Sequence, residues 1–255
     1  MAMTIDAQWL IAFLLAFVRA GAWLAVVPPF ADRKVIPPVA MVGVAGGLAI
    51  LATPHLAATP LPQDTGALLG AVVLQVLTGV ALGLSVRILL SAVTAAGGLV
   101  DIFGGVNPPP ELDPLSENQT PVLGQYYEQV GLALLFATNG EMLIIKGFES
   151  SFGAAGLTLA STAHVTTVLV NDLVTFFTAA LEIAAPIVVV LFAAQIGMAM
   201  LAKAAPQMNV WMLSFPLQML LTLGLVALAL QTMPGVIEQL VHRVLQSGAS
   251  IAGGH

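Results

Sequence analysis

The chain has 255 residues, of which 58% are hydrophobic and 8% are charged, and its mean hydropathy is +0.99. With its 24 glycines included, about two thirds of the chain is apolar, whereas a soluble domain has roughly 45 to 50% apolar residues, so the excess must face lipid or other proteins. The 7 basic and 13 acidic residues argue against a nucleic-acid-binding surface, and the absence of cysteine excludes disulfides, thiol catalysis and Cys-ligated metal.

Hydrophobic runs near the length of a membrane-crossing helix, about 20 residues, follow one another along the chain. They cover residues 9–27, 39–53, 66–103, 121–148, 171–205 and 210–233, and a shorter amphipathic helix covers 235–246. The runs lack the alternation of apolar and polar residues that is typical of outer-membrane strands. The sequence therefore predicts an all-α polytopic membrane protein with six long hydrophobic helices, forming a single domain over residues 1–255.

Two of these runs are too long for a simple span. Run 66–103 would extend roughly 57 Å and run 171–205 about 52 Å, against a hydrocarbon core of about 30 Å. Such helices must bend, break or leave the bilayer among apolar partners. The pair Gly97 and Gly98 and the residue Pro186 are the expected bend points.

Each long run carries a polar stripe along one helical face. The first stripe is Arg87, Ser91, Thr94, Gly98 and Asp101, and the second is Asn171, Thr175, Thr178 and Glu182. Ionisable residues inside apolar helices are costly, so the stripes indicate either a polar seam between helices or the lining of a water-filled path. For an ion or proton relay Glu182 is the best single candidate, although the sequence shows no partner for it.

Enzyme motifs are missing from the sequence. It contains no GxSxG, HExxH or P-loop pattern, and its four histidines are scattered rather than placed at metal-ligand spacing. We therefore expect no catalytic residue, no metal and no cofactor.

A polar loop over residues 104–120 separates the third and fourth runs. It holds three acidic residues, no basic residue and four prolines, which keep it extended. The residues that could have a functional role here include Phe103, which directly precedes the loop. The full set is Phe103, Val106, Pro108, Leu112, Asp113, Pro114 and Leu115. The loop is either a solvated connector or a segment that packs its apolar residues inside protein or a wet cavity.

Several segments occur in an order typical of one family. They are Arg19-Ala20-Gly21, residues 26–49, Asp113-Pro114, residues 121–123, Asn139-Gly140 and residues 150–152. The most specific stretch is 204–225, with Pro206, Gln207, Asn209, Val210, Phe215 and Pro216. In these segments the chain resembles the FliR family, the R component of the flagellar type III export gate, together with its injectisome counterpart.

The resemblance implies a non-enzymatic subunit that closes a spiral assembly with FliP and FliQ and forms a pore for unfolded flagellar proteins. It further implies helices arranged as bent hairpins, contacts with the FlhB and FlhA export components, and a place in the bacterial inner membrane at the flagellum basal body. Loop 104–120 corresponds to part of the pore plug in this family. The chain departs from the family pattern in the length, acidity and proline content of this loop, and in Glu141, where many relatives have histidine.

Two alternatives stay open at this point. One is an injectisome subunit of the same family. The other is a small ion-coupled secondary transporter. Its candidate ion-coupling residues are the ionisable residues within the hydrophobic runs, namely Glu182, Glu141, Asp101 and Arg87. Transporters of that kind usually show two related halves, and the two halves of this chain do not align.

Overall fold

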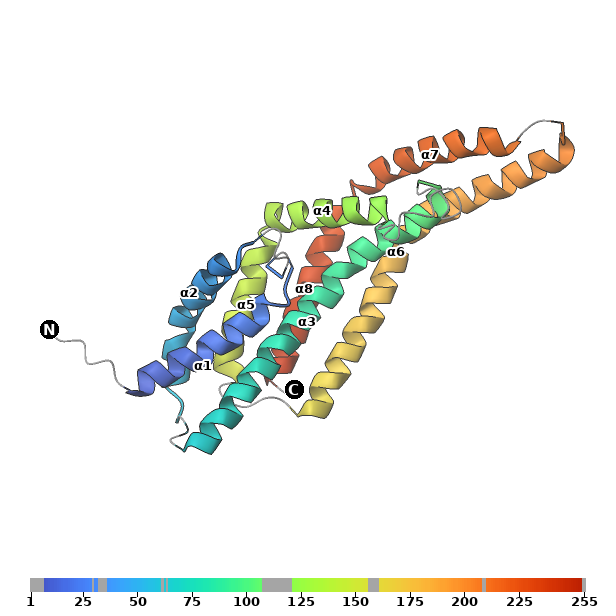
Figure 1. Cartoon of the computed structure of the whole chain (residues 1–255). Helices are drawn as coiled ribbons and strands as arrows, with labels where there is room; N and C mark the ends of the chain where they lie inside the picture. Colours follow the sequence, from blue (N-terminus) through green and yellow to red (C-terminus); the bar gives the residue numbers. More distant parts are fainter. Residues whose placement is uncertain are drawn as a thin grey trace. The chain divides into compact units, whose positions relative to one another are not determined.

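The computed structural model describes residues 7–28, 30–31, 36–60, 62, 64–106, 121–155, 161–207 and 210–253. Over these residues the regular structure is entirely α-helical, as the sequence predicts (Figure 1). The helices are α1 (Ala7–Leu24), α2 (Pro38–Ala57), α3 (Thr65–Gly104), α4 (Val122–Ala137), α5 (Gly140–Ala155), α6 (Thr162–Ala204), α7 (Val210–Ala229) and α8 (Met233–Gly253).

The predicted run 121–148 is not one helix, which is a correction to the sequence prediction. It consists of α4 and α5, which are separated at Thr138 and Asn139. The backbone of Asn139 is left-handed, with φ of 55°, a conformation that ends a helix and that asparagine tolerates better than most residues. The Asn139-Gly140 dipeptide is the sequence signal for this break.

The start of α6 is a second correction, because the helix begins at Thr162 rather than at residue 171. Ser161 caps it, since its hydroxyl accepts the backbone N–H of His164 at 3.2 Å. In the same way Asp64 caps α3 by accepting the N–H of Gly66 at 3.1 Å. The last helix, α8, is also longer than predicted at both ends.

The two longest helices are continuous through their expected bend points. Helix α3 has 40 residues and includes Gly97 and Gly98, and α6 has 43 residues and includes Pro186. Bends of 74° and 60° occur at short breaks between α4 and α5 and between α7 and α8.

Four of the described helices, α1, α2, α3 and α6, are long and apolar enough to cross a membrane. The number rises to six if the bent pairs α4 with α5 and α7 with α8 each form one span. Length and composition therefore agree with a polytopic membrane protein.

The chain divides into two compact units. The first comprises Met1–Leu89, Asn139–Val174 and Leu240–His255, and the second comprises Leu90–Thr138 and Thr175–Gln239. Helices α1, α2 and α5 belong to the first unit and α4 and α7 to the second, whereas α3, α6 and α8 each contribute to both.

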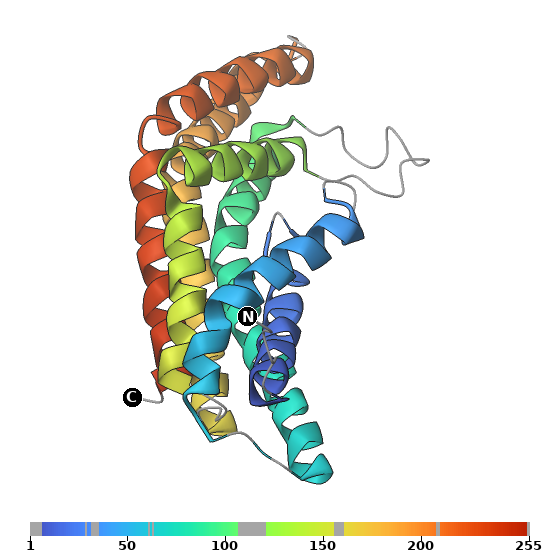
Figure 2. The same ribbon diagram turned by 90° about the vertical axis from the view of Figure 1, so that its left-hand side faces the viewer.

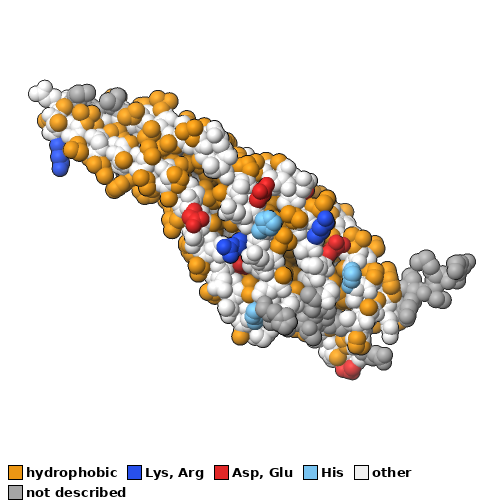
Figure 3. All heavy atoms as spheres, turned by 180° about the vertical axis from the view of Figure 1, so that it is seen from behind, with side chains coloured by type: hydrophobic (Ala, Val, Ile, Leu, Met, Phe, Trp, Pro, Cys, Tyr) orange, Lys and Arg blue, Asp and Glu red, His pale blue; other side chains and the backbone are white. Residues whose placement is uncertain are grey.

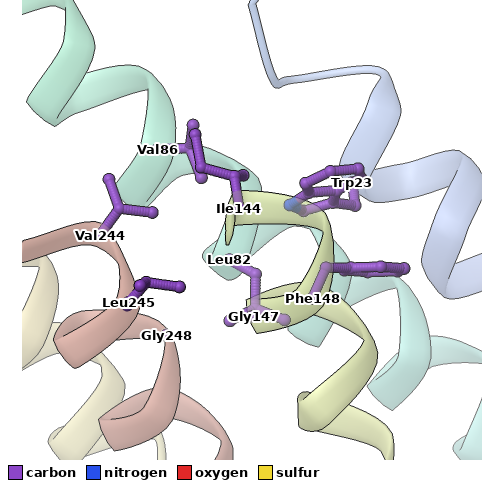
Figure 4. Close-up of a pocket in the computed structure, with 9 residues that line it drawn as sticks. All are labelled: Trp23, Leu82, Val86, Ile144, Gly147, Phe148, Val244, Leu245 and Gly248. Atoms are coloured by element: carbon purple, nitrogen blue, oxygen red, sulfur yellow. The ribbon is translucent and has the colours of Figure 1, made fainter. Parts of the chain in front are cut away.

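In the first unit, α1 and α2 form a hairpin, and α2 also packs against α5 (Figures 1 and 2). The Trp23 ring of α1 stacks on Phe148 of α5 with 4.4 Å between ring centroids. A small pocket beside this pair brings four helices together (Figure 4). Its lining residues are Trp23, Leu82, Val86, Ile144, Gly147, Phe148, Val244, Leu245 and Gly248.

Close approach of α1 and α3 depends on Gly79. A Cβ atom at Gly79 would lie 2.5 Å from the carbonyl oxygen of Arg19 and 3.0 Å from the Cβ of Ala22, whereas a Cβ at Gly70 would meet nothing within 4 Å. Because the nearest atom belongs to the backbone, Gly79→Leu must push the two helices apart. We expect it to destabilise the protein by about 2 to 3 kcal/mol, and Gly70→Leu to leave stability nearly unchanged.

This contrast is measured by thermal unfolding of the purified variants in one detergent. Equal unfolding temperatures for Gly79→Leu and Gly70→Leu would show that the α1 and α3 backbones are not in contact at this position.

Large apolar side chains are exposed on both units. Val39 of α2 is 83% exposed, and in α7 Met212 is 75% and Leu220 is 71% exposed. Figure 3 shows hydrophobic side chains over much of one face, with charged and histidine side chains at intervals among them. Side chains of this size and number are incompatible with water alone and indicate contact with lipid or partner proteins.

Candidate functional site

The end of α3, from which loop 104–120 departs, is held by two side chains of the second unit. The amide Nε2 of Gln195 in α6 donates to the carbonyl oxygen of Phe103 at 3.0 Å. The hydroxyl of Thr222 in α7 shares its proton between the carbonyl oxygen of Gln218 in its own helix, at 2.8 Å, and the carbonyl oxygen of Gly104, at 3.3 Å. Thr222 itself is fully buried. The last carbonyl groups of α3, which lack partners within the helix, are thereby satisfied by two neighbouring helices.

Two consecutive glycines make this arrangement possible. A Cβ atom at Gly104 would lie 2.7 Å from Cγ2 and 2.8 Å from Oγ1 of Thr222, so a side chain there would displace α7. The next residue, Gly105, has φ of +61°, the left-handed conformation with which many helices end. Oε1 of Gln218 would lie 3.1 Å from a Cβ at this position. The chain thus leaves α3 in a direction set by packing against α7.

The far end of the same loop is also tied to α3. The buried carboxylate of Asp101 accepts the backbone N–H of Leu123, in the first turn of α4, at 3.3 Å. A negative charge at a helix N-terminus is favourable because of the unpaired N–H groups there. A Cβ at Gly97 would lie 2.5 Å from the carbonyl oxygen of Leu123, so α3 and α4 approach closely at this point. We call Asp101, Gln195 and Thr222, with the groups they bind, the loop base.

The predicted plug residues are only partly described. Phe103 and Val106 are half-buried at the loop base. The other plug residues, Pro108, Leu112, Asp113, Pro114 and Leu115, lie outside the described residues. Their role in closing a pore remains a prediction.

The two polar stripes differ in burial. On α3, Arg87 is exposed, Asp101 is buried, and the residues between them, Ser91, Thr94 and Gly98, are half-buried. On α6, Thr175 is half-buried and the other members, Asn171, Thr178 and Glu182, are exposed. The α3 stripe thus ends in a polar seam at the loop base, whereas the α6 stripe lies on an outer face, Glu182 included.

Sequence reasoning missed the most buried charge in the first unit, Arg19. Its side chain is fully buried, its Nε donates to Oε1 of Gln75 at 2.5 Å, and its Nη1 donates to the carbonyl oxygen of Ser151 at 3.1 Å. The guanidinium lies over the Phe152 ring, 4.3 Å from the centroid. Arg19 therefore joins α1, α3 and α5. Its position as the one charge inside the first hydrophobic run was an available signal.

Sequence reasoning also missed a buried carboxylate, Asp172 of α6. Its Oδ2 accepts the hydroxyl of Ser85 in α3 at 2.6 Å, and its Oδ1 accepts the hydroxyl of Ser247 in α8 at 2.5 Å. Two turns earlier, His164 of α6 is hydrogen-bonded to Ser250 of α8 at 2.9 Å. Short polar contacts thus fasten α8 to the start of α6. In the part of the chain that the structure describes, no three His, Asp or Glu side chains form a metal site.

Most of the motif residues that carried the family resemblance are exposed where they are described, although Val210 is buried. Pro206 and Gln207 are exposed in the turn after α6, Asn209 is outside the described residues, and in α7 Phe215 is 45% exposed and Pro216 is exposed. These residues are therefore available for contact with other molecules.

Comparison with known proteins agrees with the resemblance. Residues 10–244 match the family described as bacterial export proteins, family 1. The chain is 26% identical over 211 residues, 81% of each chain, to the flagellar biosynthetic protein FliR of Bacillus subtilis (strain 168). It is 25% identical over 247 residues to the protein of that name in Escherichia coli (strain K12), covering 96% of this chain and 94% of the relative. Yop proteins translocation protein T of Yersinia pestis is 23% identical over 180 residues, 69% of each chain.

Proposed function

We propose that this chain, which belongs to family 1 of the bacterial export proteins, is a non-enzymatic subunit of a flagellar type III export gate. The observation that carries the proposal is the match along nearly the whole chain, from residue 10 to residue 244, to a family of export proteins. The helices that could cross a membrane support a place in the bacterial inner membrane, and the flagellar relatives support a place at the flagellum basal body.

In this role the chain assembles with FliP and FliQ subunits, contacts the FlhB and FlhA export components, and helps to form the pore for unfolded flagellar proteins. The exposed apolar side chains of α2, α6 and α7 support the assembly, because they offer more surface than a monomer in water could tolerate. The exposed Pro206, Gln207 and Phe215 lie in the segment that most resembles the family.

We further propose that loop 104–120 contributes to closing the pore. The loop base supports this, because a segment that closes an opening must leave the protein from a fixed point. Gln195 and Thr222 hold the end of α3, and Asp101 holds the start of α4, so both ends of the loop are tied to packed helices.

Co-purification tests the assembly. The tagged chain is expressed with the P and Q subunits of its own organism, extracted in mild detergent and analysed by native mass spectrometry. We expect one complex that contains a single copy of this chain, and a poorly behaved protein when the chain is expressed alone. A stable, monodisperse complex of this chain alone that transports a small solute would contradict the proposal.

The Yersinia relative favours a second candidate, an injectisome subunit of the same family. A strain that lacks the gene distinguishes the two systems. Loss of swimming motility with normal effector secretion indicates the flagellar system. Normal motility with loss of effector secretion indicates the injectisome. The transporter alternative is tested by Glu182→Gln, which must abolish ion-coupled uptake in vesicles if that alternative holds. The exposure of Glu182 on α6 does not favour it.

A further inference from the structure

Two elements of the first unit, α5 and the second half of α8, each carry an exposed basic side chain. Helix α5 carries an exposed Lys146, and α8 carries an exposed Arg243. By contrast, α2 in the same unit contains no Asp, Glu, Lys or Arg. The first unit therefore has surfaces of two different chemical kinds.

The two polar helices pack directly against each other. A Cβ atom at Gly147 of α5 would lie 2.7 Å from Cδ2 of Leu245 in α8, and both helices line the small apolar pocket (Figure 4). Figure 2 shows α5 and this part of α8 side by side. Their outer faces are consequently adjacent.

Helical periodicity defines the outer face of each helix. In α8 the exposed residues His242, Gln246 and Ala249 are spaced at i, i+4 and i+7, which places two polar side chains and one small one on the same side. The opposite side of α8 is buried and holds Leu240, Val241, Val244 and Ile251. In α5 the exposed Lys146 and Ser150 are spaced at i and i+4, opposite the buried Phe148, and the exposed Met142 lies one turn before Lys146 on the same side. We call these five exposed residues, Lys146, Ser150, His242, Gln246 and Ala249, the polar face.

Contact of the polar face with lipid is unfavourable. Lys146 and the nearby Arg243 lie well inside their helices rather than at the ends, so their side chains cannot extend easily to a membrane surface if the helices cross the bilayer. A helix that lies flat in the membrane surface needs a free apolar side to enter the lipid. The apolar side of α8 is already covered within the first unit.

We propose that the polar face borders a water-filled space of the assembled protein, whereas the exposed apolar side of α2 is shielded from water. The inference goes beyond the export function, because it states that the polar face contacts water. It does not depend on which substrate the protein handles.

Cysteine labelling tests the inference, and the chain suits it because it contains no natural cysteine. Ser150→Cys, Gln246→Cys and Ala249→Cys report on the polar face, and Val39→Cys and Ile50→Cys, 83% and 57% exposed on α2, are matched controls. Each variant is assembled with its natural partners in membrane vesicles open to both sides. The vesicles are treated with a charged, membrane-impermeant maleimide, which reacts only with a hydrated thiol.

We expect the three polar-face cysteines to react at least about tenfold faster than the two α2 cysteines, because the reactive thiolate forms in water and not in an apolar environment. Equal rates on both faces would overturn the inference. It would also be overturned if the polar-face cysteines reacted in the chain alone but were protected in the assembly, since a partner subunit would then cover that face. Unchanged amounts of assembled protein show that each variant folds.

Discussion

Replacing Arg19 with leucine is expected to destabilise the protein by roughly 3 to 5 kcal/mol, enough to remove most of the assembled complex. The guanidinium is the shared partner of Gln75 and Ser151, and all three side chains are buried. Leucine would leave the Oε1 atom of Gln75 without its donor, in addition to the Nε2 atom, which already has no hydrogen-bond partner in the described structure. Each buried polar group left unpaired costs about 1 to 3 kcal/mol.

The variant Arg19→Lys tests whether the positive charge of residue 19 is sufficient for stability without the planar shape of the guanidinium. Lysine keeps the positive charge but lacks the planar fork that reaches two helices and stacks on Phe152, so we expect an intermediate loss. Arg87→Leu is the matched control, because Arg87 is exposed on α3 in the same unit. The measurement is the yield and unfolding temperature of the complex in detergent. If Arg19→Leu behaved like Arg87→Leu, the buried network would have no role in stability.

The helical class and most helix positions were predictable from the sequence. A long apolar run in a membrane protein has to form a helix, because only a helix satisfies all its backbone hydrogen bonds within the segment itself. The break between α4 and α5 was missed although the Asn139-Gly140 dipeptide signals it, because it rests on a single left-handed residue inside a long, mostly apolar run. The early start of α6 was missed for a related reason. Residues 162–171 mix polar and apolar residues, and besides the Ser161 cap it is the burial of Val165 and Val168 against other elements that stabilises a helix there.

The candidate sites were predictable only in part, since periodicity identifies a face but not what covers it. The stripe on α3 does share one face, yet its environment changes from exposed at Arg87 to buried at Asp101. Arg19 bonds to residues 56 and 132 positions away in sequence, and Asp172 to residues 87 and 75 positions away. Such partners follow from tertiary packing, which no local pattern in a single sequence contains. The same holds for Gln195 and Thr222 at the loop base.

Deleting residues 108–117 is expected to make the assembled gate permeable to ions without preventing its assembly. If loop 104–120 contributes to closure, its removal opens the pore, whereas the loop base survives because Asp101, Gln195 and Thr222 are outside the deleted segment. The measurement is ion conductance of membranes that contain the assembled complex, with the amount of complex determined in parallel. Unchanged conductance would show that the loop is only a connector.

Point variants at the loop base should give a smaller leak than the deletion. Thr222→Val keeps the side-chain shape but removes the hydroxyl, which bonds to Gln218 in its own helix and also reaches the carbonyl oxygen of Gly104, so the loop leaves α3 from a less constrained position. Thr222→Ser keeps the hydroxyl and should conduct no more than the unmodified gate. Thr166→Val is the matched control, because the hydroxyl of this exposed threonine bonds within its own helix. A leak in the deletion without one in Thr222→Val would mean that the loop closes the pore through contacts of its own, and that the hydrogen bond to α7 does not set its position.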